Sequence, residues 1–138
     1  MAITADGFVP EQIKTNVIKI YSYKLKNLVG CVYNPFTKET KDFLTTFQML
    51  EILENIMDET DFPQATTKWR SFNSDSESKK ENVVVKAETS QPVIATFNLK
   101  VLFRQNSTWQ GSLVWADQSS VSQFRSVYEM LILMDSVL

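Results

Sequence analysis

Residues 97–115 read Phe-Asn-Leu-Lys-Val-Leu-Phe-Arg-Gln-Asn-Ser-Thr-Trp-Gln-Gly-Ser-Leu-Val-Trp, two alternating segments separated by a polar cluster. Apolar residues occupy every second position from Phe97 to Phe103, which is the period of a strand with one buried face. The Asn-Ser-Thr cluster favours a turn, because small polar side chains can hydrogen-bond their own backbone. The stretch therefore predicts a β-hairpin with strands at 93–105 and 109–115.

The same hydrophobic pattern occurs 81 residues earlier in the chain, without a gap. This offset separates Gly30 from Gly111 and Met49 from Met130. It also pairs Ile18 with Leu99, Ile20 with Val101, Val32 with Leu113, Phe43 with Phe124, Phe47 with Tyr128, Leu50 with Leu131, and Leu53 with Met134. A fixed offset of this kind predicts an internal repeat whose two copies share one fold.

Each copy is predicted to form two strands followed by an amphipathic helix. In the first copy the strands fall at 17–25 and 28–34 and the helix at about 40–59. In the second copy the helix begins near Ser119, because apolar residues there recur every three or four positions. Neither copy can cover its apolar face alone, so we expect an α+β fold in which both pack about a pseudo-twofold axis. An antiparallel sheet covered by two helices is the predicted architecture.

The two copies, at residues 16–59 and 93–138, are joined by a connecting segment at 60–92. Within this segment residues 73–82 contain no apolar residue and are predicted to form an exposed loop. One extra strand is predicted on each side of the loop, at 65–72 and at 83–88, where Thr, Val and aromatic residues are frequent. A length of 138 residues is that of a single domain.

The composition argues against several functional classes and suggests a compartment. The chain has 14 basic and 16 acidic residues and no histidine, so the commonest general base and the commonest zinc ligand are absent. No apolar run approaches the roughly 18 residues that cross a bilayer, and the N-terminal residues lack the pattern of a signal peptide. The only cysteine, Cys31, cannot form an intramolecular disulfide. We therefore expect a cytoplasmic protein that makes no use of a membrane.

No motif for catalysis or for cofactor binding is found in the sequence. Glu51 and Glu54 have a spacing that could meet a metal, but they lie away from the apolar stripe, as a solvated helix face requires. The counterpart of Cys31 in the second copy is Ser112, which favours a small residue packed on the sheet rather than a catalytic thiol. We expect no catalytic residue, no metal and no cofactor, and we rank an enzyme of unrecognised type third.

One strand face is predicted to be basic and aromatic. If Ile18 and Ile20 point to the core, the alternate residues lie on the opposite face of the sheet. The candidate partner or nucleic-acid surface comprises Lys19, Tyr21, Tyr23, Tyr33, Lys100 and Arg104, with Trp69 and Arg70 from the connecting segment. Aromatic rings beside cations are what single-stranded nucleic-acid binding requires. The net charge of −2 favours the alternative, an ordinary wetted face or one that another subunit covers.

The end of the second helix is apolar on all sides. Its sequence Met130-Leu-Ile-Leu-Met134 must be covered by more than one surface, either the other copy or another chain. The candidate oligomer interface comprises Met130, Ile132, Leu133 and Met134.

Two resemblances add expectations to this reading. The stretch Phe103-Arg-Gln-Asn-Ser-Thr-Trp-Gln-Gly-Ser-Leu-Val-Trp115, followed by Phe124-Arg-Ser-Val-Tyr-Glu-Met-Leu-Ile-Leu-Met-Asp135, resembles small Firmicutes proteins. That resemblance implies a bacterial cytoplasmic setting and carries no activity with it. The order of elements resembles the whirly-type single-stranded-DNA-binding fold and its purine-rich-element-binding relatives, which use four strands per repeat. That second resemblance is an analogy of fold.

Two functional expectations rank above the enzyme. The first is a non-enzymatic binding or regulatory module whose partner is another protein or a second copy of the chain. The alternative is a single-stranded nucleic-acid-binding protein that uses the basic aromatic face.

Overall fold

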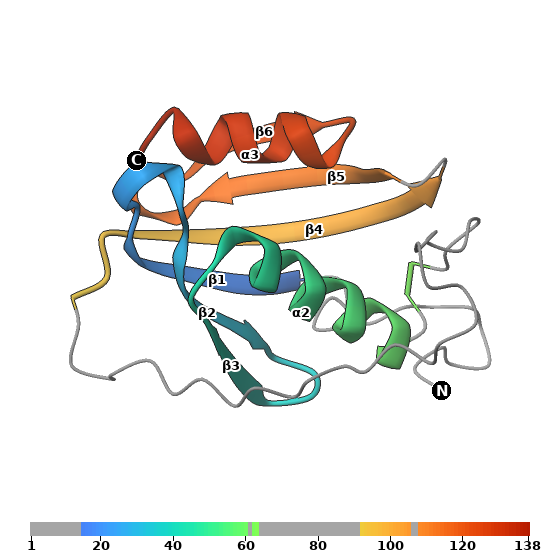
Figure 1. Cartoon of the computed structure of the whole chain (residues 1–138). Coiled ribbons are helices and arrows are strands. Elements are labelled where there is room, and N and C mark those ends of the chain that lie inside the picture. Colours follow the sequence, from blue (N-terminus) through green and yellow to red (C-terminus); the bar gives the residue numbers. More distant parts are fainter. Residues whose placement is uncertain (1–14, 61, 64–91, 106–107) are drawn as a thin grey trace, which may run out of the picture.

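Each copy of the repeat folds as three strands followed by a helix (Figure 1). The computed structural model describes residues 15–60, 62–63, 92–105 and 108–138. The first copy contains β1 (Thr15–Ser22), β2 (Val29–Asn34), β3 (Glu39–Phe43) and α2 (Thr46–Thr60), with a short 3-10 turn η1 (Lys24–Lys26). The second contains β4 (Ala95–Gln105), β5 (Thr108–Trp115), β6 (Ser120–Phe124) and α3 (Val127–Asp135), with η2 (Ala116–Gln118). The strands predicted at 65–72 and 83–88, and the loop at 73–82, lie outside the described residues.

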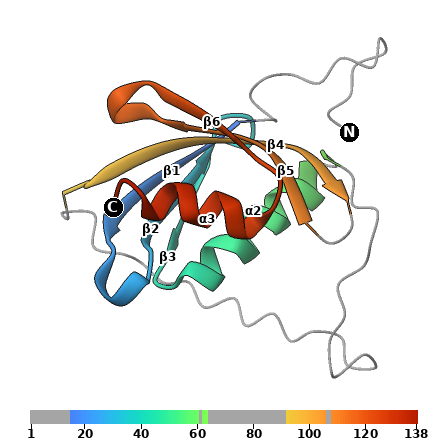
Figure 2. The same cartoon turned by 90° about the horizontal axis from the view of Figure 1, so that it is seen from above.

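The described strands form one antiparallel sheet in the order β3-β2-β1-β4-β5-β6. Both helices lie on the same face of this sheet, as Figure 2 shows. The protein thus has the expected α+β architecture. The two copies meet where β1 pairs with β4 at the centre of the sheet, and there Val17 lies opposite Asn98. These two residues are also equivalent under the offset of 81, so the pseudo-twofold axis passes between them.

The duplication is visible in the backbone as well as in the core. Irregular strand register occurs after Ile20 in β1 and after Val101 in β4, positions that the offset relates. The turns before β3 and β6 both contain a left-handed residue, Lys38 with φ 57° and Ser119 with φ 51°. Copies that share bulges and turn conformations at equivalent positions confirm the predicted repeat.

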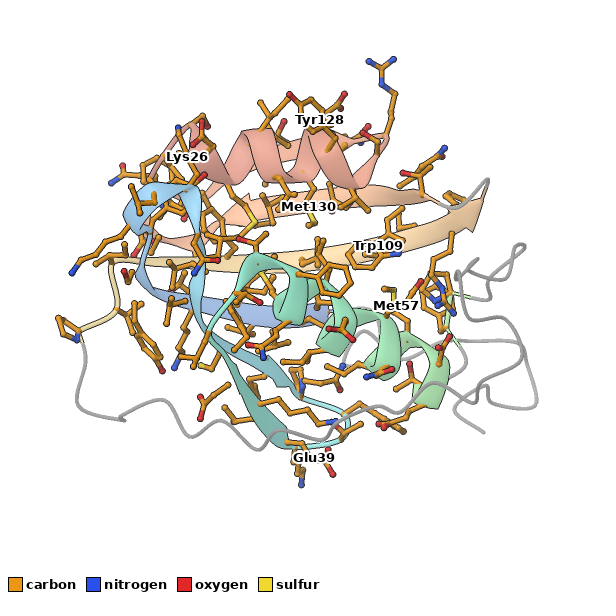
Figure 3. The ribbon with its side chains drawn as sticks, viewed as in Figure 1. Lys26, Glu39, Met57, Trp109, Tyr128 and Met130 are labelled. Atoms are coloured by element: carbon orange, nitrogen blue, oxygen red, sulfur yellow. The ribbon has the colours of Figure 1, made fainter. Side chains whose placement is uncertain are left out.

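The hydrophobic core fills the layer between the sheet and the two helices. Strand residues Ile18, Val32, Leu99 and Leu113 are buried on one side of this layer. Met49 and Leu53 of α2 and Met130 and Met134 of α3 are buried on the other. Figure 3 shows Met130 between α3 and the sheet. Fully buried methionines leave nothing for a second chain to cover, so the predicted placement of Met130 and Met134 in an oligomer interface is wrong.

The helices begin later than the sequence spacing predicts, because β3 and β6 precede them. Phe43 and Phe124 end these strands and are buried in the core. Phe47 and Tyr128, which the offset of 81 pairs, are 70% and 74% exposed. The true helix starts carry capping residues: the Thr45 hydroxyl accepts from the Gln48 backbone N–H, and the Ser126 hydroxyl accepts from the Glu129 backbone N–H, both at 3.1 Å.

Candidate binding surface

The sheet face opposite α2 and α3 is the candidate site, because no helix among the described residues covers it (Figure 2). Directly paired residues place one row of side chains straight across this face. We call it the central row, and from β3 to β6 it comprises Thr40, Tyr33, Val17, Asn98, Val114 and Val121. The row contains no charged residue, and the pseudo-twofold axis maps it onto itself.

Two lysines flank the central row on opposite sides. Lys19 of β1 lies opposite Cys31, and Lys100 of β4 lies opposite Ser112, so the offset of 81 relates the two settings. Lys19 is exposed and Lys100 is half-buried. Tyr33 lies in the central row itself. These three predicted residues are therefore together on the uncovered face.

Tyr21 and Cys31 contact each other on this face. The Tyr21 hydroxyl and the Cys31 sulfur are 3.3 Å apart and share a hydrogen bond. That hydrogen bond, followed by burial, raises the pKa of Tyr21 to about 12. Tyr21 is consequently neutral at physiological pH, and the buried thiol has a polar partner. The arrangement agrees with the expected packing role of Cys31.

Tyr23 does not belong to the uncovered face, which corrects the sequence prediction. Its hydroxyl donates to Asp135 Oδ1 of α3 at 2.8 Å, and Lys26 Nζ donates to the same oxygen at 2.6 Å. Burial and then the Asp135 hydrogen bond raise the pKa of Tyr23. The hydrogen bonds from Lys26 and Tyr23 lower the pKa of Asp135. Figure 3 shows Lys26 beside the end of α3, on the side of the sheet that carries the helices.

Arg104 is also on the helix side, and its predicted exposure is wrong. The register changes between Val101 and Phe103, so Leu102 is an extra residue in the strand and every later side chain changes face. Arg104 is only 6% exposed. Its Nη1 donates to Glu54 Oε2 and to Asp58 Oδ1, each at 2.9 Å, and its Nε donates to the carbonyl oxygen of Pro63.

The same bulge turns two apolar residues outward that the sequence reasoning missed. Phe103 is 53% exposed, and Leu102 is also exposed. At the bulge, two residues of β4 lie opposite one residue of β5. The alternation of residues within one strand does not show where such a bulge falls. Val121, at the β6 end of the central row, falls in the segment predicted as helix and is 66% exposed. Trp69 and Arg70 lie outside the described residues.

In the part of the chain that the structure describes, no group of three or more cysteine, aspartate or glutamate residues is placed to hold a metal ion. None of the described helices is long and apolar enough to cross a membrane. What the face offers is an uncharged row, half of it valine, with Lys19 and Asp42 on one side and Lys100 on the other.

Fold and site together define a duplicated α+β domain with one helix-covered and one uncovered sheet face. The chain matches no family model, and no curated protein or solved structure shows significant similarity to it. The resemblance of its last third to small Firmicutes proteins stays an expectation. The whirly-type analogy differs in strand number, since each copy here has three described strands before its helix.

Proposed function

We propose that this chain is a non-enzymatic binding module that holds a partner protein on the uncovered sheet face. The observation that carries the proposal is the central row, which crosses all the described strands without a charge and is flanked by Lys19 and Lys100. Protein interfaces commonly combine a core depleted in charge with a polar rim. The row supplies such a core, and the two lysines supply the rim.

The charges of the face indicate the chemistry of the partner. A strip that binds between the two lysines is favoured by acidic groups on both of its sides, because opposite charges across an interface attract, and Asp42 beside Lys19 favours a basic group there as well. The pseudo-twofold relation of the lysines adds that these acidic groups lie on opposite sides of the strip. A partner surface with carboxylates diagonal to each other across an apolar ridge fits the face.

Site-specific photo-crosslinking in the native cells tests this proposal. Tyr33 in the central row and Phe47 on α2 are replaced, one at a time, by a photoreactive phenylalanine. Both positions carry an aromatic residue, but they lie on opposite sides of the sheet. We expect a discrete adduct from position 33 and not from position 47. Adducts of equal yield at both positions would contradict the proposal.

A second variant tests whether the adduct depends on the central row. Val114→Glu places a carboxylate inside the row, so it should abolish the adduct from position 33 while the far-UV circular dichroism stays unchanged. Val114 is half-buried on β5, and its counterpart in the first copy is Tyr33, so the position accepts a polar atom. An adduct that persists at full yield in this variant argues against the row as the contact surface.

Single-stranded nucleic acid is the second candidate, and the pairing of Lys19 and Lys100 with Tyr33 favours it. Two lysine contacts to phosphates give a slope of about −1.4 when the logarithm of the binding constant is plotted against that of the salt concentration. Fluorescence anisotropy with a mixed-sequence oligonucleotide measures this slope. Absence of binding at low salt removes the candidate, and Lys19→Glu with Lys100→Glu should abolish any binding seen.

A further inference from the structure

The two edge strands are equivalent under the repeat, yet their charges differ completely. β3 carries Glu39, Lys41 and Asp42. The residues 81 positions later in β6 are Ser120, Ser122 and Gln123. Lys41 lies directly opposite buried Val32, so the charge sits on the side of the edge that faces the core layer. Charges on edge strands, inward-pointing ones above all, prevent pairing with another chain.

β6 is uncharged from Ser120 to Phe124 and open to solvent. Its first four residues are all exposed. Among the described strands it pairs only with β5, so one row of its backbone N–H and C=O groups faces outward. Of the two edges, the protecting charges are therefore found on β3 alone.

Exposed apolar side chains accompany β6 on both sides of the sheet. Val121 lies on the uncovered face next to Val114. On the helix side, Ile132 of α3 is 48% exposed, whereas the equivalent residue of α2 is the charged Glu51. Figure 3 shows Tyr128 on the side of α3 away from β5. The loss of charge thus extends from the strand to the Ile132 position of the neighbouring helix, whereas Tyr128 has an equally exposed aromatic counterpart in Phe47.

We propose that β6 pairs antiparallel with β6 of a second copy of this chain, so that one sheet continues through two molecules. An antiparallel strand pair related by a twofold axis is self-complementary, because each strand meets the same backbone groups that it presents. In such a pair Val121 and Ile132 of both copies gather at the junction. The proposal goes beyond the partner-binding face, because it concerns the sheet edge.

The charges at the two ends of β6 select the antiparallel direction. Asp117 lies before the strand, where its Oδ2 accepts from the Thr96 backbone N–H and from Trp115 Nε1. Arg125 follows the strand with 87% of its side chain exposed and a 3.6 Å pair to Glu129. Antiparallel pairing brings Arg125 of each copy toward the Asp117 end of the other. Parallel pairing would place like charges side by side, which is unfavourable.

The test transfers the charges of β3 to β6. The triple variant Ser120→Glu, Ser122→Lys, Gln123→Asp reproduces residues that the fold already accepts at the equivalent positions. Light scattering after gel filtration is run at about 100 µM, where a dimer of micromolar Kd is largely associated. We expect the wild-type mass to be twice 15.9 kDa and the mass of the triple variant to be 15.9 kDa. Lys41→Glu, a change at the other edge that keeps it charged, should leave the dimer mass unchanged.

A second measurement keeps the proposal testable should the triple variant misfold. Ser122→Cys places a thiol in the middle of β6, while the native Cys31 is buried. Mild oxidation should then give a disulfide-linked dimer, and Lys41→Cys on β3 should not. A monomeric wild-type protein, or a dimer that keeps its mass with charged β6, overturns the proposal. Photo-crosslinking at position 33 in the triple variant reports separately on the partner-binding face.

Discussion

Arg104 Nη1 on β4 donates to Glu54 Oε2 on α2 at 2.9 Å, a contact that joins a strand of the second copy to the helix of the first. The residues 81 positions away from this pair are Tyr23 and Asp135. They form the reciprocal contact, in which the Tyr23 hydroxyl donates to Asp135 Oδ1 at 2.8 Å. Each helix is therefore anchored by a polar residue of the other copy.

The burial of the Arg104 contact predicts a large effect of its removal. Arg104→Ala should lower the free energy of unfolding by about 3 kcal/mol, because it leaves the Glu54 carboxylate without its buried cation. Urea denaturation measures the loss. The matched change Tyr23→Phe should cost less, since Asp135 keeps Lys26 and is more exposed. Equal losses of unfolding free energy in the two variants would contradict the larger contribution of the Arg104 contact.

The two glycines at equivalent positions are required by close backbone approach. A Cβ at Gly30 would overlap the carbonyl oxygen of Lys19, and a Cβ at Gly111 would overlap that of Lys100. Gly30→Ala and Gly111→Ala should each destabilise the fold by about 3 kcal/mol, as forced backbone shifts do. Thermal unfolding followed by circular dichroism tests this. Ser112→Ala, the neighbouring control, should change the midpoint little.

We expect the Tyr21 hydroxyl to lose its proton only at high pH, because of its hydrogen bond to Cys31. Because the hydrogen bond to Cys31 is the main cause of the raised pKa, Cys31→Ala should lower the pKa of Tyr21 from about 12 toward 10.0. The neutral hydroxyl stabilises the fold below pH 10.0, and this contribution is lost as the pH rises toward 12. Nuclear magnetic resonance titration of the Tyr21 ring measures the shift, with Tyr23 as the unaffected control. A Tyr21 pKa that stays near 12 in the variant would count against the hydrogen bond.

The lowered pKa of Asp135 predicts a dependence of stability on pH whose sign is opposite to that of Tyr21. Its pKa in the folded protein lies below the ordinary 3.8, so its contribution to stability is present above pH 3.8 and is lost as the pH falls through the lower value. Asp135→Asn should therefore be less stable than the wild type at neutral pH, and the difference should shrink below pH 3.8. Urea midpoints measured across this range test the sign. A difference that grows in acid would refute the role of the carboxylate.

The repeat could be predicted from the sequence because it depends on local apolar register. Ile18 and Leu99, or Met49 and Met130, occupy equivalent buried sites, as the offset indicates. The third strand of each copy was missed for a physical reason. Phe43 ends a strand and Phe47 lies in the helix, yet a four-residue spacing across the junction has the period of one continuous helix. The capping residues Thr45 and Ser126 were the available signal for the true starts.

The composition of the candidate surface was only partly predictable. Lys19, Tyr33 and Lys100 lie where strand alternation puts them, on the face opposite the buried Ile18 and Leu99. Arg104 does not, because a single extra residue at Leu102 inverts the alternation beyond it. Bulges depend on how two strands pair, and pairing is not encoded in one strand alone.

The exchange of polar anchors between the copies has a consequence for how such a chain could arise. A half-length chain with β1, β2, β3 and α2 alone could satisfy the same contacts by associating with an identical molecule about the axis between Val17 and Asn98. Gene duplication and fusion would then turn that ancestral homodimer into one polypeptide. In one polypeptide the two halves can change independently, and the difference in charge between β3 and β6 is a difference of that kind.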